Sequence, residues 1–66
     1  MVKSLHYRKC LIRATEVFEN EEKAIHWLNS PNFALGNVRP VDLLKTKEGV
    51  DKVLDTLGRI EYGIFV

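Results

Sequence analysis

The sequence lacks the features that hold many small proteins together covalently. Among its 66 residues there is one cysteine, Cys10, so no internal disulfide can form, which fits a reducing compartment. It also lacks an apolar run long enough to span a membrane and the N-terminal apolar block of a signal peptide. We therefore expect a cytoplasmic protein without membrane contact, stabilised by packing, self-association or a partner.

Residue patterns that support catalysis or metal binding are equally scarce. His6 and Cys10 are four residues apart and would share a helix face, with His26 as a third candidate ligand. No Cys-x-x-Cys pair or second spaced pair completes such a site, so a core position is the better interpretation of Cys10. Gly36 and Gly49 are isolated and belong to no phosphate-binding motif. We predict no catalytic residues, no metal site and no cofactor.

Charge is nearly balanced overall but is distributed unevenly. The formal net charge is +1, with ten basic and nine acidic side chains. Four basic residues precede the first acidic residue, Glu16; they are Lys3, Arg8, Lys9 and Arg13. The chain from Glu16 onward contains the other six basic residues and all nine acidic ones, so its net charge is −3. Such a segment usually forms a solvated helix face, and contact with nucleic-acid phosphates is the alternative.

What the sequence does contain is helical periodicity in a single domain covering residues 1–66. Hydrophobic residues make up 45% and charged residues 29%, an ordinary globular balance. An apolar stripe predicts a helix over about 3–18; its members are Tyr7, Cys10, Leu11, Ala14, Val17 and Phe18. Asn20 should cap a second helix that buries Ala24, Ile25 and Leu28, with Trp27 at the core or its edge, and that ends at Asn29 or Ser30 before Pro31.

The second half of the chain predicts a loop followed by two further helices. Residues 31–40 are rich in turn formers and allow at most one turn at 33–35. Pro40 should open a short helix over 40–45, with Arg39 and Asp42 pairing locally around it. Thr46 should cap the last and longest helix, whose apolar stripe consists of Val50, Val53, Leu54, Leu57 and Ile60.

The end of the last helix and the tail beyond it are the least ordinary part of the sequence. Gly58, at the edge of the apolar stripe, indicates either close helix packing or a weak point, and Gly63 should end the helix with a positive φ. The chain then finishes on Ile64, Phe65 and Val66, which we expect to be extended. The predicted fold is all-α, a small helical bundle of about four helices with an extended apolar C-terminal tail.

An apolar tail is unusual because chain ends are commonly polar and loosely held. Leaving three such side chains in water forgoes about 1.5 to 3 kcal/mol of burial each, a large amount for so small a domain. Composition alone leaves two alternatives open: the tail is buried in the protein's own core, or it is offered to a partner.

Three ordered blocks of residues carry a family resemblance. The first reads V-F-x-x-x-x-K-A-x-x-W-L-x-x-P-N-x-A-L-G and begins at Val17; the second, R-P-x-D-L-L-x-T-x-x-G, begins at Arg39; the third, G-R-I-E-Y-G, begins at Gly58. Together they resemble the C-terminal toxin-binding domain of the Xre/MbcA/ParS antitoxins over about 14–66. Asn37 stands where a second glycine is common, a mild change in a turn that asparagine tolerates.

The resemblance implies a function and a set of site residues. It implies an antitoxin that neutralises a RES-domain toxin, an enzyme that degrades NAD in the bacterial cytoplasm, by covering the toxin's active-site cleft with its own C-terminal end. Carried onto this sequence, it implies a partner-binding segment made of Arg59, Glu61, Tyr62, Gly63, Ile64, Phe65 and Val66. Inhibition would then proceed by occupancy, with Tyr62 and Phe65 as aromatic anchors and the Val66 carboxylate as a charge for the toxin's nucleotide pocket.

One departure from the family bears on DNA binding. Family members usually carry a helix-turn-helix domain before this region, and 66 residues leave no room for one, so sequence-specific DNA binding is not expected. The chain is then either a stand-alone toxin-binding module or a fragment or alternative start of a longer antitoxin. A small DNA-binding regulator and an enzyme are the remaining functional alternatives, and a dimer or larger assembly is expected from the thin core and the apolar stripe of the first helix.

Overall fold

The computed structural model describes residues 5–63, and within this range the chain is helical. The elements in chain order are α1 (Leu5–Phe18), α2 (Glu21–Leu28), the 3-10 helices η1 (Phe33–Leu35) and η2 (Pro40–Leu43), and α3 (Lys47–Glu61). Over these residues no strand forms, and the only β-type pairing is a single antiparallel bridge between Asn32 and Val38. The all-α prediction is confirmed. The predicted apolar tail, Ile64 to Val66, lies outside the described residues.

The predicted count of about four helices is slightly wrong, because the expected helix over residues 40–45 is a 3-10 turn that ends at Leu43. Its amides bond three residues back: Asp42 N donates to Arg39 O at 2.9 Å. The α3 cap at Thr46 follows too closely for a second turn. The predicted pairing of Arg39 with Asp42 is confirmed, with two hydrogen bonds of 3.0 and 2.9 Å that lower the pKa of the Asp42 carboxyl.

Local capping chemistry fixes the starts of α2 and α3 and the end of α3 as the sequence predicts, whereas α2 ends at Leu28, one residue before the range predicted. The Asn20 side chain accepts a hydrogen bond from Lys23 N at 2.9 Å, and Thr46 Oγ1 accepts one from Gly49 N at 3.0 Å. Each oxygen satisfies one of the free amides at a helix start. Gly63, with φ of 71°, takes the left-handed conformation predicted for the end of α3.

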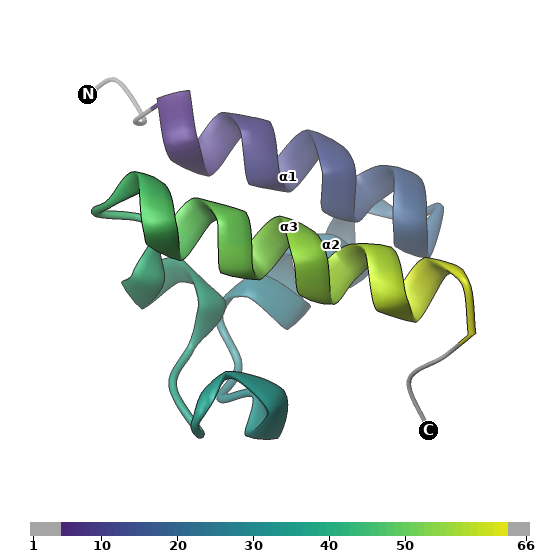
Figure 1. Cartoon of the computed structure of the whole chain (residues 1–66). Coiled ribbons are helices and arrows are strands. Elements are labelled where there is room, and N and C mark those ends of the chain that lie inside the picture. The colour runs from purple at the N-terminus through teal and green to yellow at the C-terminus, as the bar shows by residue number, and fades with distance from the viewer. Residues whose placement is uncertain (1–4, 64–66) are drawn as a thin grey trace.

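Helices α1 and α3 run side by side in the same direction, and α2 packs on α1 behind them (Figure 1). Besides apolar packing, long-range polar contacts of His6 and Arg13 join α1 to the second half of the chain. His6 Nδ1 donates to the carbonyl oxygen of Leu44 at 3.0 Å, and Arg13 pairs with Glu61. These contacts hold α1 against the residue segment just before α3 and against the last turn of α3.

The core lies where the three α-helices meet. Its fully or nearly buried apolar residues are Cys10, Ala14, Ala24, Leu28, Leu44, Val50, Val53 and Leu57. Cys10 is thus a core residue as predicted, and burial raises the pKa of its thiol. Trp27 is half-buried at the core edge, with its ring 6.0 Å from that of Phe18.

Two expectations about individual side chains need correction. Ile25 was expected in the core but is 40% exposed. Ala24 and Leu28, four residues apart, share the buried face of the short α2, which turns the neighbouring Ile25 outward. Gly58 does not mark close helix packing either, since a Cβ atom built there meets nothing within 4 Å. Across residues 5–63, no helix combines the length and the apolar character needed to cross a bilayer.

Candidate functional site

The candidate site is the C-terminal end of α3, where four of the seven predicted site residues fall within residues 5–63. Arg59 and Glu61 belong to the last turn of α3, Tyr62 follows as its C-cap, and Gly63 comes next. The other three, Ile64, Phe65 and Val66, lie outside the described range. The four described residues are therefore consecutive or nearly so in the chain, but Glu61 faces α1 whereas Arg59 lines a groove beside η1.

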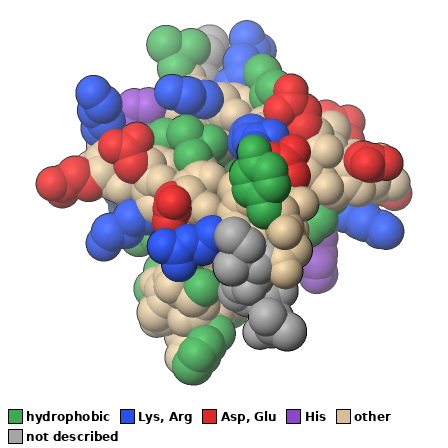
Figure 2. Space-filling model, turned by 45° about the vertical axis from the view of Figure 1, so that its right-hand side comes forward, with side chains coloured by type: hydrophobic (Ala, Val, Ile, Leu, Met, Phe, Trp, Pro, Cys, Tyr) green, Lys and Arg blue, Asp and Glu red, His purple; other side chains and the backbone are tan. Residues whose placement is uncertain are grey.

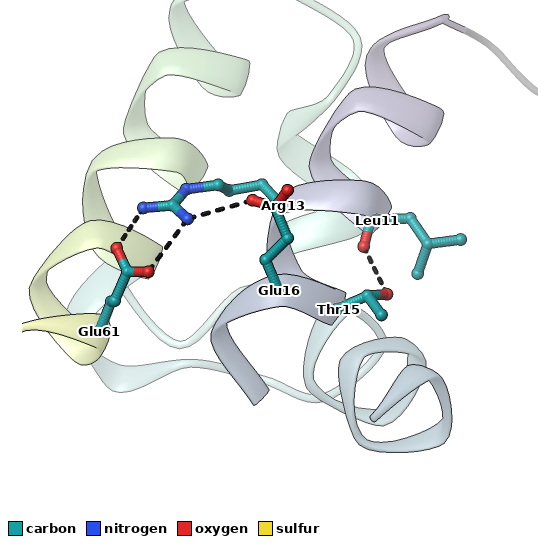
Figure 3. A network of polar contacts seen from close by, with 5 residues as sticks. All are labelled: Leu11, Arg13, Thr15, Glu16 and Glu61. Atoms are coloured by element: carbon teal, nitrogen blue, oxygen red, sulfur yellow. Dashed lines mark hydrogen bonds and ion pairs between the residues drawn. The ribbon is translucent and has the colours of Figure 1, made fainter. Parts of the chain in front are cut away.

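Glu61 is held by Arg13 of α1 (Figure 3). Both guanidinium nitrogens of Arg13 donate to the Glu61 carboxylate, one of them at 3.3 Å, and Nη1 also lies 3.3 Å from Glu16 Oε1. The hydrogen bond from Arg13 lowers the pKa of Glu61, and the same bond raises the pKa of Arg13. This bidentate contact, called the Arg13–Glu61 clasp below, attaches the end of α3 to α1.

Tyr62 carries a large exposed side chain directly beyond the clasp. Its side chain is 77% exposed, while its backbone amide still bonds to Gly58 O at 3.1 Å. The next amide, of Gly63, bonds to Ile60 O at 3.1 Å in a left-handed turn. The backbone here is fixed by hydrogen bonds, so the phenol ring is displayed from an ordered position rather than from a loose end.

Arg59 links the helix end to a groove between α3 and the segment of η1 and η2. It pairs with Asp55 at 3.2 Å, and both side chains are about two-thirds exposed, so the pair is a weak surface contact. The groove has a volume of about 450 Å³. Lys52, Asp55, Thr56 and Arg59 of α3 line one side, and Ala34, Leu35 and Leu43 line the other. Over the face shown in Figure 2, basic and acidic side chains intermix and hydrophobic ones are scattered among them.

Sequence reasoning missed both the clasp and the groove. The clasp joins residues 48 positions apart, and nothing in the helical pattern of either segment indicates that Arg13 faces the end of α3. The groove depends on how η1 packs against α3, which no local motif specifies. The available signal was weak: Arg13 is a basic residue close to the apolar stripe of α1, where a charge needs a partner.

The metal-ligand candidates are engaged elsewhere or separated. His6 Nδ1 is occupied by the carbonyl of Leu44, and Cys10 is completely buried in the core. In the part of the chain that the structure describes, no three His, Cys, Asp or Glu side chains gather as metal ligands. The helix end thus offers an exposed aromatic ring, ion-paired side chains and a fixed backbone, which suit recognition of another macromolecule.

Comparison with known proteins decides the family. The family described as "Antitoxin Xre/MbcA/ParS C-terminal toxin-binding domain" matches residues 13–63, most of the chain. The chain belongs to this antitoxin family. The match begins at Arg13 and ends at Gly63, so it contains both partners of the clasp, the groove and the exposed Tyr62.

Curated relatives of the antitoxin family agree. A protein named "Antitoxin Xre" from Yersinia enterocolitica is 40% identical over 53 residues, which cover 79% of this chain and 36% of that protein. Another "Antitoxin Xre", from Photorhabdus laumondii, is 38% identical over 77% of this chain and 35% of its own length. A "Prs ADP-ribosylating antitoxin" from Sphingobium is 43% identical over 77% of this chain and 32% of its own length. The chain spans about a third of the length of these relatives.

Proposed function

We propose that this antitoxin-family chain binds a RES-type, NAD-degrading toxin in the cytoplasm and blocks its active site with the C-terminal segment, residues 59–66. The observation that carries the proposal is the exposed Tyr62, at the end of α3 within a chain of the toxin-binding-domain family. A single exposed tyrosine on an ordered backbone is typical of a binding anchor, because it buries a large area at small entropic cost.

The proposed mechanism is occupancy without turnover. Tyr62 and Phe65 would act as aromatic anchors, and the Val66 carboxylate would supply a charge that a nucleotide-binding pocket accepts. The Arg13–Glu61 clasp would hold the start of this segment in place, which reduces the ordering cost on binding. The chain itself needs no cofactor, metal or catalytic group for this role.

The name of the Sphingobium relative connects it with ADP-ribosylation, and this supports an NAD-using toxin as the partner class. Transfer of ADP-ribose and degradation of NAD both break the bond between nicotinamide and ribose, so both enzymes bind NAD. An inhibitory segment that occupies the NAD pocket suits either chemistry. Consumption of NAD is therefore the readout of choice.

The test compares deletion of residues 64–66 and Tyr62→Ala with the unaltered chain. The proposal predicts that the reading frame beside this chain's gene encodes a RES-domain protein, and that protein is the probe. We expect both variants to keep their helicity by circular dichroism, because Tyr62 is mostly exposed, and to lose inhibition of NAD consumption. Tyr62→Ala should weaken binding by about thirtyfold, as expected for an aromatic anchor.

A control is Ile25→Ala, which removes an exposed apolar side chain of α2 that belongs neither to the C-terminal segment nor to the exposed apolar face of α1. It should inhibit like the unaltered chain. A tail deletion that melts the helices, or one that still inhibits fully, contradicts the partner role of the C-terminal segment. An unaltered chain that neither binds nor inhibits the probe contradicts the proposed function itself.

DNA binding is proposed to be weak and without sequence preference. Arg8 and Lys9 are exposed on α1, but the charge of Arg13 is paired with Glu61 and Glu16, which weakens the basic segment as a phosphate contact. A gel-shift assay at physiological salt should show no preference for the operon's own promoter over unrelated duplex. Selective retardation of the promoter fragment would contradict this.

We also propose that the chain self-associates into a dimer or larger assembly, through apolar side chains of α1 other than those of its buried stripe. The α1 stripe that motivated it packs inside the molecule, with Cys10 and Ala14 fully buried. The large hydrophobic side chains that remain exposed on α1 are Leu5, at 80%, and Ile12, at 56%, which lie two turns apart on one face. Sedimentation should show an assembly at high micromolar concentration, and a monomer there would refute it.

A further inference from the structure

Phe33 is the most exposed large hydrophobic side chain between residues 5 and 63, at 87%. It opens η1 at the tip of the segment 32–38, called the Phe33 loop below. A phenylalanine ring is entirely apolar, so its exposure to water at the tip of a loop is unfavourable unless another surface covers it. Neither the helix periodicity nor the clasp accounts for this residue.

The Phe33 loop is held by hydrogen bonds centred on Asn32. The Asn32 side chain accepts from Ala34 N at 2.8 Å, and its carbonyl accepts from Leu35 N at 3.0 Å and from Asn37 N at 2.8 Å. Its own amide donates to Val38 O at 3.0 Å. The aromatic ring is therefore presented from a fixed backbone, which is the arrangement that lowers the ordering cost of binding.

The loop is continuous with the candidate site through the groove. Ala34 and Leu35, directly after Phe33, form one wall of the groove, and Arg59 lies in the opposite wall. Arg59 is also the first residue of the C-terminal segment that ends α3. In Figure 1, η1 lies below α3 and α1 lies above it, so the groove and the loop are on the side of α3 away from α1.

We propose that the toxin contacts a second surface of this chain, in which the Phe33 ring enters an apolar pocket of the toxin and the groove beside it receives a toxin side chain. The inference rests on the proposed function. Two observations favour the toxin over other occupants: the groove shares Arg59 with the segment proposed to block the active site, and the matched toxin-binding domain includes the whole loop. The antitoxin then grips its partner at two sites, and only the C-terminal one reaches the active-site cleft.

The experiment measures the dissociation constant of the complex with the adjacent RES-domain protein by calorimetry, together with inhibition of NAD consumption. Phe33→Ala removes the anchor, and Ala34→Arg places a long side chain in the groove from its exposed wall. We expect each to weaken binding by at least about tenfold, within the range of interface anchors, with unchanged helicity. At saturating concentration the Phe33→Ala chain should still inhibit fully, because its C-terminal segment is intact.

Ile25→Ala is again the control, because Ile25 is an exposed apolar residue of α2 that lies outside the groove and the Phe33 loop, and this variant should bind like the unaltered chain. If Phe33→Ala and Ala34→Arg both bind with unchanged affinity, the second contact is refuted while the proposed function stands. If the unaltered chain does not bind the probe, the second contact and the proposed function are both refuted. If Phe33→Ala leaves toxin affinity unchanged but lowers the mass found by sedimentation, the loop contacts a second copy of this chain and the toxin assignment is wrong.

Discussion

Gly49 lies in the first turn of α3, directly against the backbone of Leu43. A Cβ atom built on Gly49 would stand 1.7 Å from the Leu43 carbonyl oxygen and 2.7 Å from its carbonyl carbon. No side chain fits that space without moving the backbone between η2 and α3. The glycine therefore sets how closely the 3-10 turn and the last helix approach each other, and it is buried with its amide bound to Thr46.

We predict that Gly49→Ala destabilises the domain by about 1 to 3 kcal/mol, as expected when a methyl group is forced into a packed site. Gly58→Ala is the matched control on the same helix, where an added Cβ meets nothing within 4 Å. It should instead stabilise the domain by about 0.5 to 1 kcal/mol through helix propensity. Urea unfolding followed by circular dichroism measures both. Equal effects of the two substitutions would contradict the steric role of Gly49.

The sequence predicts residues whose roles are local and misses those whose roles depend on distant partners. Asn20, Thr46 and Gly63 were correctly predicted because a cap acts on amides and carbonyls within a few residues. The packing of Gly49 could not be predicted, because its constraint comes from the path of the chain at Leu43. The prediction that Ile25 is buried was wrong, because a helix of two turns has too few residues for its periodicity to define the buried face.

At the scale of elements, the Arg13–Glu61 clasp is a polar contact between the middle of α1 and the last turn of α3. It closes the pair opposite the contact of His6 with Leu44. The two side chains are about one-third exposed, so water screens the attraction and the contribution to stability is modest. The value of the clasp lies in position, because it fixes the end of α3 from which the C-terminal segment departs.

The clasp predicts a pH dependence. The pKa of Glu61 is lowered in the folded chain, so the stability that this group contributes is present above its unfolded pKa, about 4.3, and is lost as the pH falls through the lower folded value. Glu61→Gln should reduce stability at pH 7 and make the decline below about pH 4.3 shallower. Urea midpoints measured from pH 7 to pH 2.5 test this. The pKa of Asp42 is also lowered, by its hydrogen bonds from Arg39. Asp42 therefore contributes a loss of stability at low pH that remains in the Glu61→Gln variant.

A double-substitution cycle isolates the contact from these background effects. Arg13→Gln and Glu61→Gln should each lower the urea midpoint at pH 7, and the double variant should lower it by less than the two single effects added together. As the pH falls and the Glu61 carboxylate becomes protonated, the coupling should shrink, because the neutral carboxyl no longer attracts the Arg13 guanidinium. Additive effects at pH 7 would show that the two side chains do not act as a pair.

The order and type of the α-helices were predictable because each has an apolar stripe, and because α2 and α3 also begin at a local cap. The type of the short helix expected over residues 40–45 was not predictable, because whether a turn that begins at a proline becomes α or 3-10 depends on the number of residues left before the next cap at Thr46. The candidate site divides in the same way. Its position along the chain, at the end of α3, came from the family resemblance, whereas the clasp and the groove arise only when η1, α1 and α3 pack together.

At the scale of the whole molecule, one thin core supports every surface feature described above. The apolar residues buried among positions 5–63 come from all three α-helices, from Pro40 in η2 and from Leu44, which follows η2. A 66-residue domain has a free energy of unfolding of about 3 to 10 kcal/mol at typical values per residue. Loss of one large core side chain therefore removes a large share of the total, and the Phe33 loop and the end of α3 would be lost with the helices.

We predict that Leu57→Ala, at a fully buried position of α3, destabilises the domain by about 2 to 5 kcal/mol and lowers its helicity at 37 °C. Leu54→Ala, one turn earlier and only half-buried, should cost about 1 to 2 kcal/mol and leave the domain folded. Thermal unfolding by circular dichroism compares the two. Because Leu54 does not line the groove or the helix end, its variant should still inhibit the RES-domain probe, whereas Leu57→Ala should lose inhibition and helicity together as the temperature rises. Loss of inhibition by Leu57→Ala with full helicity retained would show that the binding surface depends on more than an intact core.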